Sequence, residues 1–317
     1  MNRDLTRQLL AAGPVIGLLL VGVAFALAEP AFASERNLVT IVVQTVITAV
    51  AALGMTFVIA SGGIDLSIGS VIALAGTTVA ALLNLGVGAG VATLGGLVVG
   101  TVTGLVNGAL VTRLSLAPFV VTLGTMGAAR GVARGVAEWT NGETTIEPPR
   151  EAVAPLADLL VKQWLAPGLL LTLALVLLAS FLLRRTVFGV HTLAVGSSES
   201  TARLCGVPVE RTKVMVYALA GLMAGLAGAL QMGRVGVGDP GASLGLELNV
   251  IAAVVLGGAS LAGGSGSVSG TVVGALLMST LANGCNLLGW PTYVQQILTG
   301  VIIVAAVALD RWRQAGP

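Results

Sequence analysis

The stretch TFVIASGGIDLSIGSVIALAG, residues 56–76, places a glycine-rich break and one carboxylate between two apolar runs. A carboxylate that deep in hydrophobic sequence is costly in lipid, and it usually faces a bundle interior or a water-filled path. A glycine-interrupted apolar segment is also typical of a transport site. Because Asp is favoured at helix N-termini, Asp65 is equally open to a capping role in a tight turn between two membrane helices. Both interpretations require a membrane protein.

The composition indicates the same class. The chain is 56% hydrophobic and only 9% charged, with a mean hydropathy of +0.98, whereas soluble domains carry roughly 25% charged residues. The 44 glycines suit close approach of membrane helices. A net charge of +2 without a basic run argues against a nucleic-acid partner. Cys205, Cys285 and the single histidine, His191, lack metal-binding or disulfide spacing, so we expect no metal and no cofactor.

Ten apolar segments are each near the ~20 residues that cross a hydrocarbon core of ~30 Å. They are 11–28, 38–60, 68–85, 89–111, 116–135, 166–183, 214–232, 246–262, 268–287 and 292–309. The sequence therefore predicts an all-α, polytopic fold with about ten transmembrane helices in one permease-like domain, 1–317. The gaps at 61–67 and 263–267 are either cytoplasmic turns or helix breaks inside the membrane, and breaks would change the number of crossings.

The first segment has a second interpretation. Residues 1–34 combine a charged start, an apolar core and Ala31-Phe32-Ala33 before Ser34, which is typical of a cleavable signal peptide. Because the rest of the chain is polytopic, we favour an uncleaved first helix.

The distribution of basic residues predicts the orientation. With the N-terminus in the cytoplasm, ten of the sixteen lysines and arginines fall inside. Both termini are then cytoplasmic, segment 136–165 is an extracytoplasmic loop, and segment 184–213 is a cytoplasmic loop. Arg130 and Arg134, on one helix face near the outer end, are expected to reach lipid head groups.

The inner segment 184–213 is the longest polar stretch on its side. It predicts a short helix over 198–206, which Ser198 or Ser200 caps and Gly206 ends. A short helix held parallel to the membrane can transmit force from a cytoplasmic partner. An ordinary connecting loop is the alternative.

Four stretches resemble the permease subunits of bacterial ribose-type ABC sugar importers. They are GMTFVIASGGIDLSIGSVIALAG (54–76), APFVVTLGTMGAARG (117–131), GVHTLAVGSSESTARLCGV (189–207) and ELNVIAAVVLGGASLAGG (247–264). The resemblance implies a subunit that works as a pair, either a homodimer or a heterodimer, in the lipid of a bacterial cytoplasmic (inner) membrane. It also implies a separate ATP-binding cassette subunit and an extracytoplasmic sugar-binding protein.

In such families the cytoplasmic loop docks on the ATPase. That coupling role carries over to Gly189, Ala194, Gly196, Glu199, Ala202, Arg203 and Gly206. Val190 and Ser198 depart from the family pattern, in which a basic or polar residue and an Asn are common.

The chain itself lacks the phosphate-binding loop G-x-x-x-x-G-K-[ST]. Its two lysines, Lys162 and Lys213, follow Val161 and Thr212 rather than glycine. We therefore expect no enzyme activity here and place ATP hydrolysis on the partner subunit.

A sugar that leaves water needs its hydrogen bonds replaced, so the path should be polar. The candidates to line it are Ser61, Gly62, Gly63, Asp65, Ser67, Asn107, Thr122, Asn249, Asn283 and Asn286. Interhelical hydrogen bonding, worth ~0.6 kcal/mol per contact on average, is the alternative for each polar side chain.

The expected function is import of a pentose or hexose. Three alternatives stay open: a permease of the same type for branched-chain amino acids, nucleosides or a sugar-like signal; an ion-coupled secondary transporter, which would also show broken spans and a buried acid; and a non-transport membrane scaffold. The sequence does not name the cargo.

Overall fold

The computed structural model describes residues 3–160 and 166–314, with side chains from 13 to 160 and from 166 to 308. Within these ranges it contains thirteen α-helices, one short 3-10 helix and no β-strand, which confirms the all-α prediction. In chain order the elements are α1 (Arg3–Ala28), η1 (Pro30–Ala33), α2 (Glu35–Ala60), α3 (Ile68–Asn84), α4 (Ala89–Arg113), α5 (Pro118–Asn141), α6 (Arg150–Asp158), α7 (Pro167–Arg185), α8 (Val187–Ser197), α9 (Glu199–Leu204), α10 (Val209–Val235), α11 (Leu246–Leu256), α12 (Val268–Leu287) and α13 (Thr292–Gln314).

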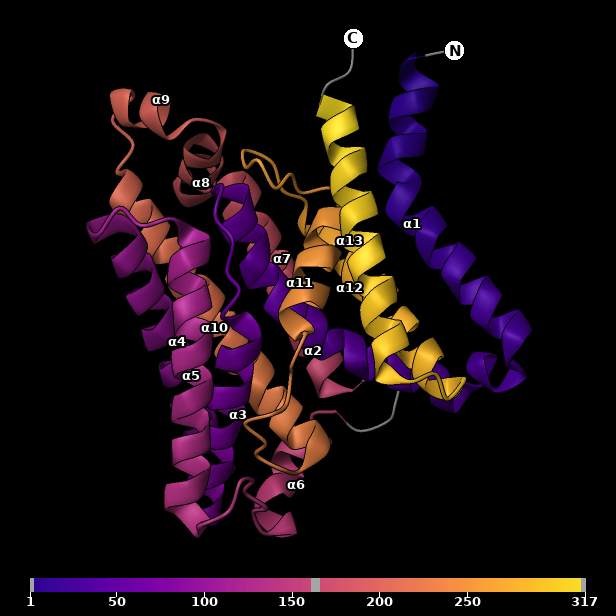
Figure 1. The fold of residues 1–317 in the computed structure, drawn as a ribbon, viewed down its shortest axis with the longest axis vertical. Helices are drawn as coiled ribbons and strands as arrows, with labels where there is room; N and C mark the ends of the chain where they lie inside the picture. Colours follow the sequence, from indigo (N-terminus) through magenta and orange to yellow (C-terminus); the bar gives the residue numbers. More distant parts are fainter. Residues whose placement is uncertain (1–2, 161–165, 315–317) are drawn as a thin grey trace.

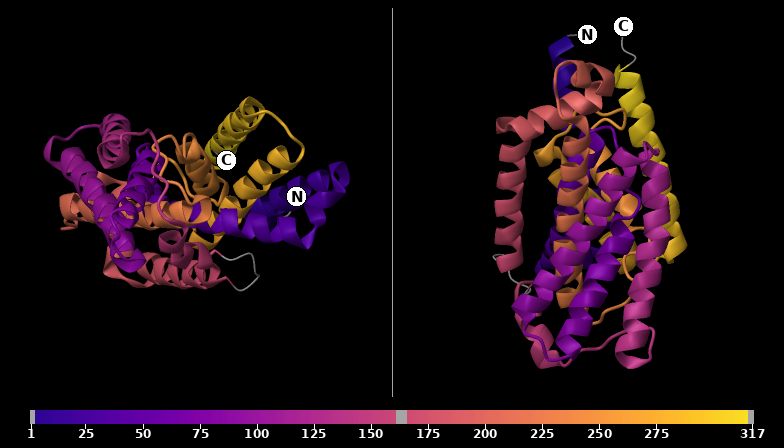
Figure 2. Two further views of the ribbon diagram at one scale, coloured as in Figure 1. Left: turned by 90° about the horizontal axis from the view of Figure 1, so that it is seen from below. Right: turned by 90° about the vertical axis from the view of Figure 1, so that its left-hand side faces the viewer.

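Five of the described helices are long and apolar enough to cross a membrane, namely α2, α4, α7, α10 and α12. Shorter apolar stretches lie in α1, α3, α8, α11 and α13. The long helices run roughly along one axis (Figure 2), as in a membrane bundle. The start of α1 and the end of α13 lie at the end of the bundle that carries α8 and α9, and α6 lies at the other end (Figure 1).

Helices α4 and α10 pack closely because glycines remove side chains from their interface. Gly96, Gly100, Gly104 and Gly108 recur every fourth residue along α4. A Cβ at Gly104 would overlap the carbonyl oxygen of Tyr217, and one at Gly100 would overlap that of Gly221. Such spacing of small residues lets two membrane helices touch through their backbones.

The gap at 61–67 leads from the end of the bundle that carries α8, where Gly62 faces Gly196, into its interior. Helix α2 ends at Ala60, the chain turns back at Gly62 (φ 79°), and α3 begins at Ile68 well inside the protein (Figure 1). The gap is therefore a turn at the α8 end followed by an irregular stretch that ends inside the bundle, so it combines features of both interpretations.

A second irregular segment, 236–245, enters the bundle from the opposite end. Helix α10 ends at Gly236 (φ 77°), and the chain returns inward to start the short helix α11 (Figure 1). The first turns of α3 and α11 meet, since a Cβ at Gly69 would lie 2.8 Å from the carbonyl oxygen of Ser243. Two broken helices therefore start side by side within the protein.

The other gap, 263–267, lies at the end that carries α8, where the Gly264 N–H donates to the Ala60 carbonyl over 3.0 Å. The predicted span 246–262 is too long, because α11 ends at Leu256 and Gly258 takes a φ of 93°. Helix α10 is longer than the predicted 214–232, and α5 continues to Asn141, beyond the predicted 135.

The short helix predicted over 198–206 is confirmed as α9. The Ser198 hydroxyl accepts from the Thr201 N–H, and the chain leaves the helix through Gly206 (φ 80°). Helix α8 was not predicted. Thr186 caps it, and it turns part of the expected loop into regular structure.

Candidate functional site

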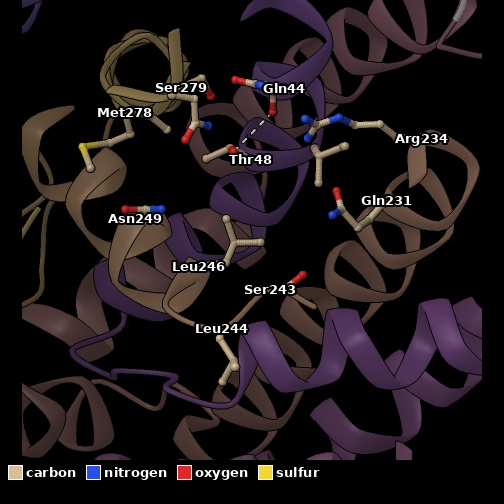
Figure 3. Close-up of a pocket in the computed structure, with 13 residues that line it drawn as sticks. Gln44, Thr48, Gln231, Arg234, Ser243, Leu244, Leu246, Asn249, Met278 and Ser279 are labelled. Carbon is tan, nitrogen blue, oxygen red and sulfur yellow. Dashed lines mark hydrogen bonds between the residues drawn. The ribbon is translucent and has the colours of Figure 1, made fainter. Parts of the chain in front are cut away.

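A polar pocket of about 220 Å³ lies between α2, α10, α11 and α12 (Figure 3). Its lining residues are Gln44, Ile47, Thr48, Gln231, Arg234, Ser243, Leu244, Leu246, Asn249, Met278, Ser279, Ala282 and Asn286. It lies in the half of the bundle away from α8 and α9, where α2 begins and α10 ends (Figure 1).

The polar groups of the pocket come from four different elements. In Figure 3 the side chains of Gln44, Arg234 and Gln231 lie on one side of the space and those of Asn249 and Ser279 on the other. The hydroxyls of Ser243 and Ser279 are buried and make no hydrogen bond in the described structure. Because an unpaired buried hydroxyl costs free energy, these two groups favour a ligand or water that pairs with them.

The pocket contains two of the residues predicted to line the path, Asn249 and Asn286. The Asn249 Oδ1 also accepts from the Thr299 hydroxyl over 3.3 Å. Asn283 lies outside the pocket. Its Oδ1 accepts from the Asn37 Nδ2 over 2.9 Å, which joins α12 to the start of α2.

Sequence reasoning missed Gln44, Gln231, Arg234 and Ser279 in this pocket. The two glutamines carried a usable signal, because each is a lone amide within an otherwise apolar helix stretch.

The carboxylate at the helix break lies in a separate buried network. The Asp65 Oδ1 accepts from the Ser67 N–H over 2.8 Å and from the Ser67 hydroxyl over 2.6 Å. The Asn107 Nδ2 donates to the Ser67 Oγ over 2.9 Å. These side chains are at most 3% exposed. The geometry is that of a carboxylate that closes the turn into α3, where the N-terminal partial charge of the helix favours a negative group.

The other candidates at the break also bond to neighbouring backbone. The Thr122 hydroxyl of α5 accepts from the Leu66 N–H over 3.1 Å and donates to the Pro118 carbonyl over 3.0 Å. The Ser61 hydroxyl donates to the Val58 carbonyl. Gly62 faces Gly196, and a Cβ at Gly63 would lie 2.6 Å from the Tyr217 hydroxyl oxygen. In this structure the candidates 61–67, Asn107 and Thr122 hold the break in place and lie outside the pocket.

The residues expected to couple to an ATPase divide into a packed group and an exposed group. Gly189 and Gly196 are packed, since added Cβ atoms would overlap the carbonyl oxygens of Leu183 and Ala60. Ala202 is buried with Val195 and Val209, and Ala194 packs against this small cluster. The cluster holds α8, α9 and the start of α10 together.

The exposed group is tied to α10 by ion pairs. Arg203 contacts Glu210 at 2.5 Å and Glu199 at 3.5 Å, and Lys213 contacts Glu199 at 2.6 Å. Beside them Leu204 is 89% exposed, and Gly206 is exposed as well. The outward surface of α9 therefore presents an exposed leucine beside charged side chains that are paired with one another.

Comparison with known proteins places the whole chain in one group. Residues 37–307 match the family described as branched-chain amino acid transport system / permease component. The chain is 38% identical to the ribose import permease protein RbsC of Bacillus subtilis over 96% of its length and 93% of that protein. It is 38% identical to RbsC of Escherichia coli K12, over 95% of this chain and 93% of that protein. It is 37% identical to the L-arabinose transport system permease protein AraH of the same strain, over 95% of this chain and 90% of that protein. No solved structure matches the chain.

Proposed function

This chain belongs to the branched-chain amino acid transport system / permease component family, and we propose that its cargo is a monosaccharide, a pentose or hexose, as it is for the ribose and L-arabinose permeases that it resembles. The sugar would pass through the polar pocket into the cytoplasm. Like the relatives it matches, it is a multi-pass permease of the cytoplasmic membrane and not an enzyme.

The chemistry of the pocket lining is the observation that supports a sugar as the cargo. Amides and hydroxyls both donate and accept hydrogen bonds, and they make up most of the polar lining. A sugar presents many hydroxyls that need both kinds of partner. Apolar side chains such as Leu244, Leu246 and Met278 complete the wall, as is usual in small-molecule sites.

Branched-chain amino acids, which the family description names, fit this lining less well. Such a cargo brings an ammonium group that needs a carboxylate or several acceptors when it leaves water. Arg234 is the one charged residue among the thirteen that line the pocket, so the lining offers a cation for the carboxylate of an amino acid but no carboxylate for its ammonium. Nucleosides lack support for a different reason, since none of those residues is aromatic and able to stack on a base.

The partners follow from the two ends of the bundle. We place the ATP-binding cassette subunit on segment 184–213, where the exposed Glu199, Arg203, Leu204 and Gly206 would meet it and the packed Gly189, Ala194, Gly196 and Ala202 would carry the motion to α2 and α10. The sugar-binding protein would dock on the opposite end, at the predicted segment 136–165, of which 161–165 lie outside the described residues, and a second permease subunit would complete the transporter. All of these elements belong to one permease domain, 1–317.

Substitution of a pocket amide tests the path. Gln231→Leu removes hydrogen-bonding groups from the pocket while keeping a similar volume, so we expect sugar uptake to fall by roughly twofold to twelvefold, the effect of ~0.5–1.5 kcal/mol for one hydrogen bond. Gln296→Leu, an exposed amide on α13 outside the pocket, is the matched control and should transport normally. The measurement is initial uptake of labelled sugar at equal amounts of folded protein. Equal uptake by the two variants would remove the pocket from the path.

A further inference from the structure

Arg130 points into the bundle, which corrects the expectation that it reaches lipid head groups. Its Nε donates to the Ser70 hydroxyl over 3.2 Å. Its Nη1 donates to the carbonyl oxygens of Pro240 and Ala242 over 2.8 and 3.2 Å. One side chain from α5 thereby joins α3 to the irregular segment 236–245.

That segment forms part of the pocket wall. Ser243 and Leu244 line the pocket, and Leu246 follows as the first residue of α11. The segment is irregular, it lies between the left-handed residues Gly236 and Gly245, and Ser243 itself has a φ of 63°. Irregular segments at the ends of helices are where hinge motions take up changes in φ and ψ. A shift of this segment would therefore change the shape of the pocket.

A second acceptor for Arg130 lies in the first turn of α11. The Glu247 Oε2 is buried and makes no hydrogen bond in the described structure. Among the charged groups around Arg130, Glu247 and Asp239 attract its charge and Arg134 repels it. A buried carboxylate oxygen without a donor is costly, so a rearrangement that brought a donor to it would be favoured.

We propose that Arg130 is a latch with two positions. In the position described here it binds the carbonyls of residues 240 and 242 and holds segment 236–245 in place. In the other position it pairs with Glu247, the two carbonyls lose their donor, and residues 239–245 move away from the pocket while the backbone of Gly238 stays bonded to that of Ile146. The two arrangements form a bistable element that admits sugar from the outer side, and this step rests on the proposed function.

A guanidinium suits this role better than an ammonium. Its fork of fixed N–H groups reaches the Ser70 hydroxyl and two carbonyls at once, whereas Lys presents a single compact charge on a flexible stem. Arg130 is a positioning residue in this account, because it acts on the pocket through the segment that it holds.

A cysteine reporter in the segment tests the latch. Ser243→Cys is introduced into a background with Cys205→Ser and Cys285→Ala, in the full transporter with its ATPase and binding protein. The measured quantity is the rate of labelling by a membrane-impermeant maleimide. We expect Arg130→Gln to raise this rate about tenfold, which corresponds to ~1.4 kcal/mol, and Arg130→Lys to raise it less. The control is Arg134→Gln, which replaces an exposed arginine one turn further along α5 and should leave the rate unchanged.

Glu247→Gln tests for an effect on the ATP-dependent labelling rate that a purely structural role of Arg130 would not produce. In the reference protein ATP should increase the labelling rate as the segment is released, and Glu247→Gln should suppress that increase while leaving the rate without ATP unchanged. If Arg130→Gln does not fold, Arg130→Lys carries the comparison. Equal labelling rates in the Arg130 and Arg134 variants, or an ATP effect that survives Glu247→Gln, would overturn the latch. Labelling needs no cargo, so a failure of sugar uptake alone would overturn the proposed function and not the latch.

Discussion

Gly104→Leu is expected to prevent accumulation of folded protein. A Cβ at this position already overlaps the carbonyl oxygen of Tyr217 and would lie 3.1 Å from the Cα of Gly221. Backbone atoms cannot rotate away as side chains do, so α4 and α10 must separate along the interface of their glycines. Overpacking a core usually costs ~1–3 kcal/mol, and we expect this change to exceed that range.

The matched control for this prediction is Gly127→Leu on α5. A Cβ at Gly127 meets nothing within 4 Å, and Leu is a better helix former than Gly, so this variant should fold at least as well as the unmodified chain. The measurement is the yield of monodisperse protein in detergent together with its melting temperature. Similar yields for the two variants would mean that α4 and α10 are not in backbone contact.

Asp65→Ala is the second substitution with a large expected effect. It removes the acceptor for both the N–H and the hydroxyl of Ser67, and each buried donor left unpaired costs ~1–3 kcal/mol. Asp65→Asn keeps an oxygen that can accept both bonds and loses only the charge. We therefore expect a large drop in melting temperature for Asp65→Ala and a smaller one for Asp65→Asn.

Asp239 provides the control, because its Oδ1 accepts from the Gly241 N–H over 2.7 Å in a similar but exposed turn. Asp239→Ala should lower the melting temperature much less than Asp65→Ala, since water can replace the lost acceptor. Normal stability of Asp65→Ala with loss of uptake would contradict the capping role and would assign this carboxylate to the transport cycle.

Several parts of the fold could be predicted because single residues determine them locally. Glycines 62 and 63 predicted the interruption after α2, and Ser198 with Gly206 predicted α9 at its ends. Helix α8 was missed because its apolar residues were taken as part of a polar loop. The inward course of 236–245 could not be predicted from its own residues, since its glycines and Asp239 are equally typical of a surface loop. It is held by contacts with residues about a hundred positions away in sequence, namely the Arg130 side chain and the backbone of Ile146.

The site was predictable only in part, for a related reason. Polar residues in apolar helices predict a buried polar contact but not which face of the helix makes it. Asn249 and Asn286 face the pocket, whereas Asn107 and Asn283 bond to neighbouring side chains, and nothing in the sequence around them separates these two outcomes. The pocket itself is assembled from residues of α2, α10, α11 and α12, so only the packing of the helices reveals Gln44 and Gln231 as neighbours.

The central claim is that this permease imports a monosaccharide at the expense of ATP split by a partner. The most direct test is uptake of labelled pentoses and hexoses by membrane vesicles that hold this chain, its ATPase and its binding protein, with ATP and the ion gradients controlled separately. The account predicts uptake of a sugar that requires ATP and the binding protein and persists when the ion gradients are collapsed. Uptake that survives without ATP and stops when an ion gradient is removed would contradict it and would make the chain an ion-coupled transporter.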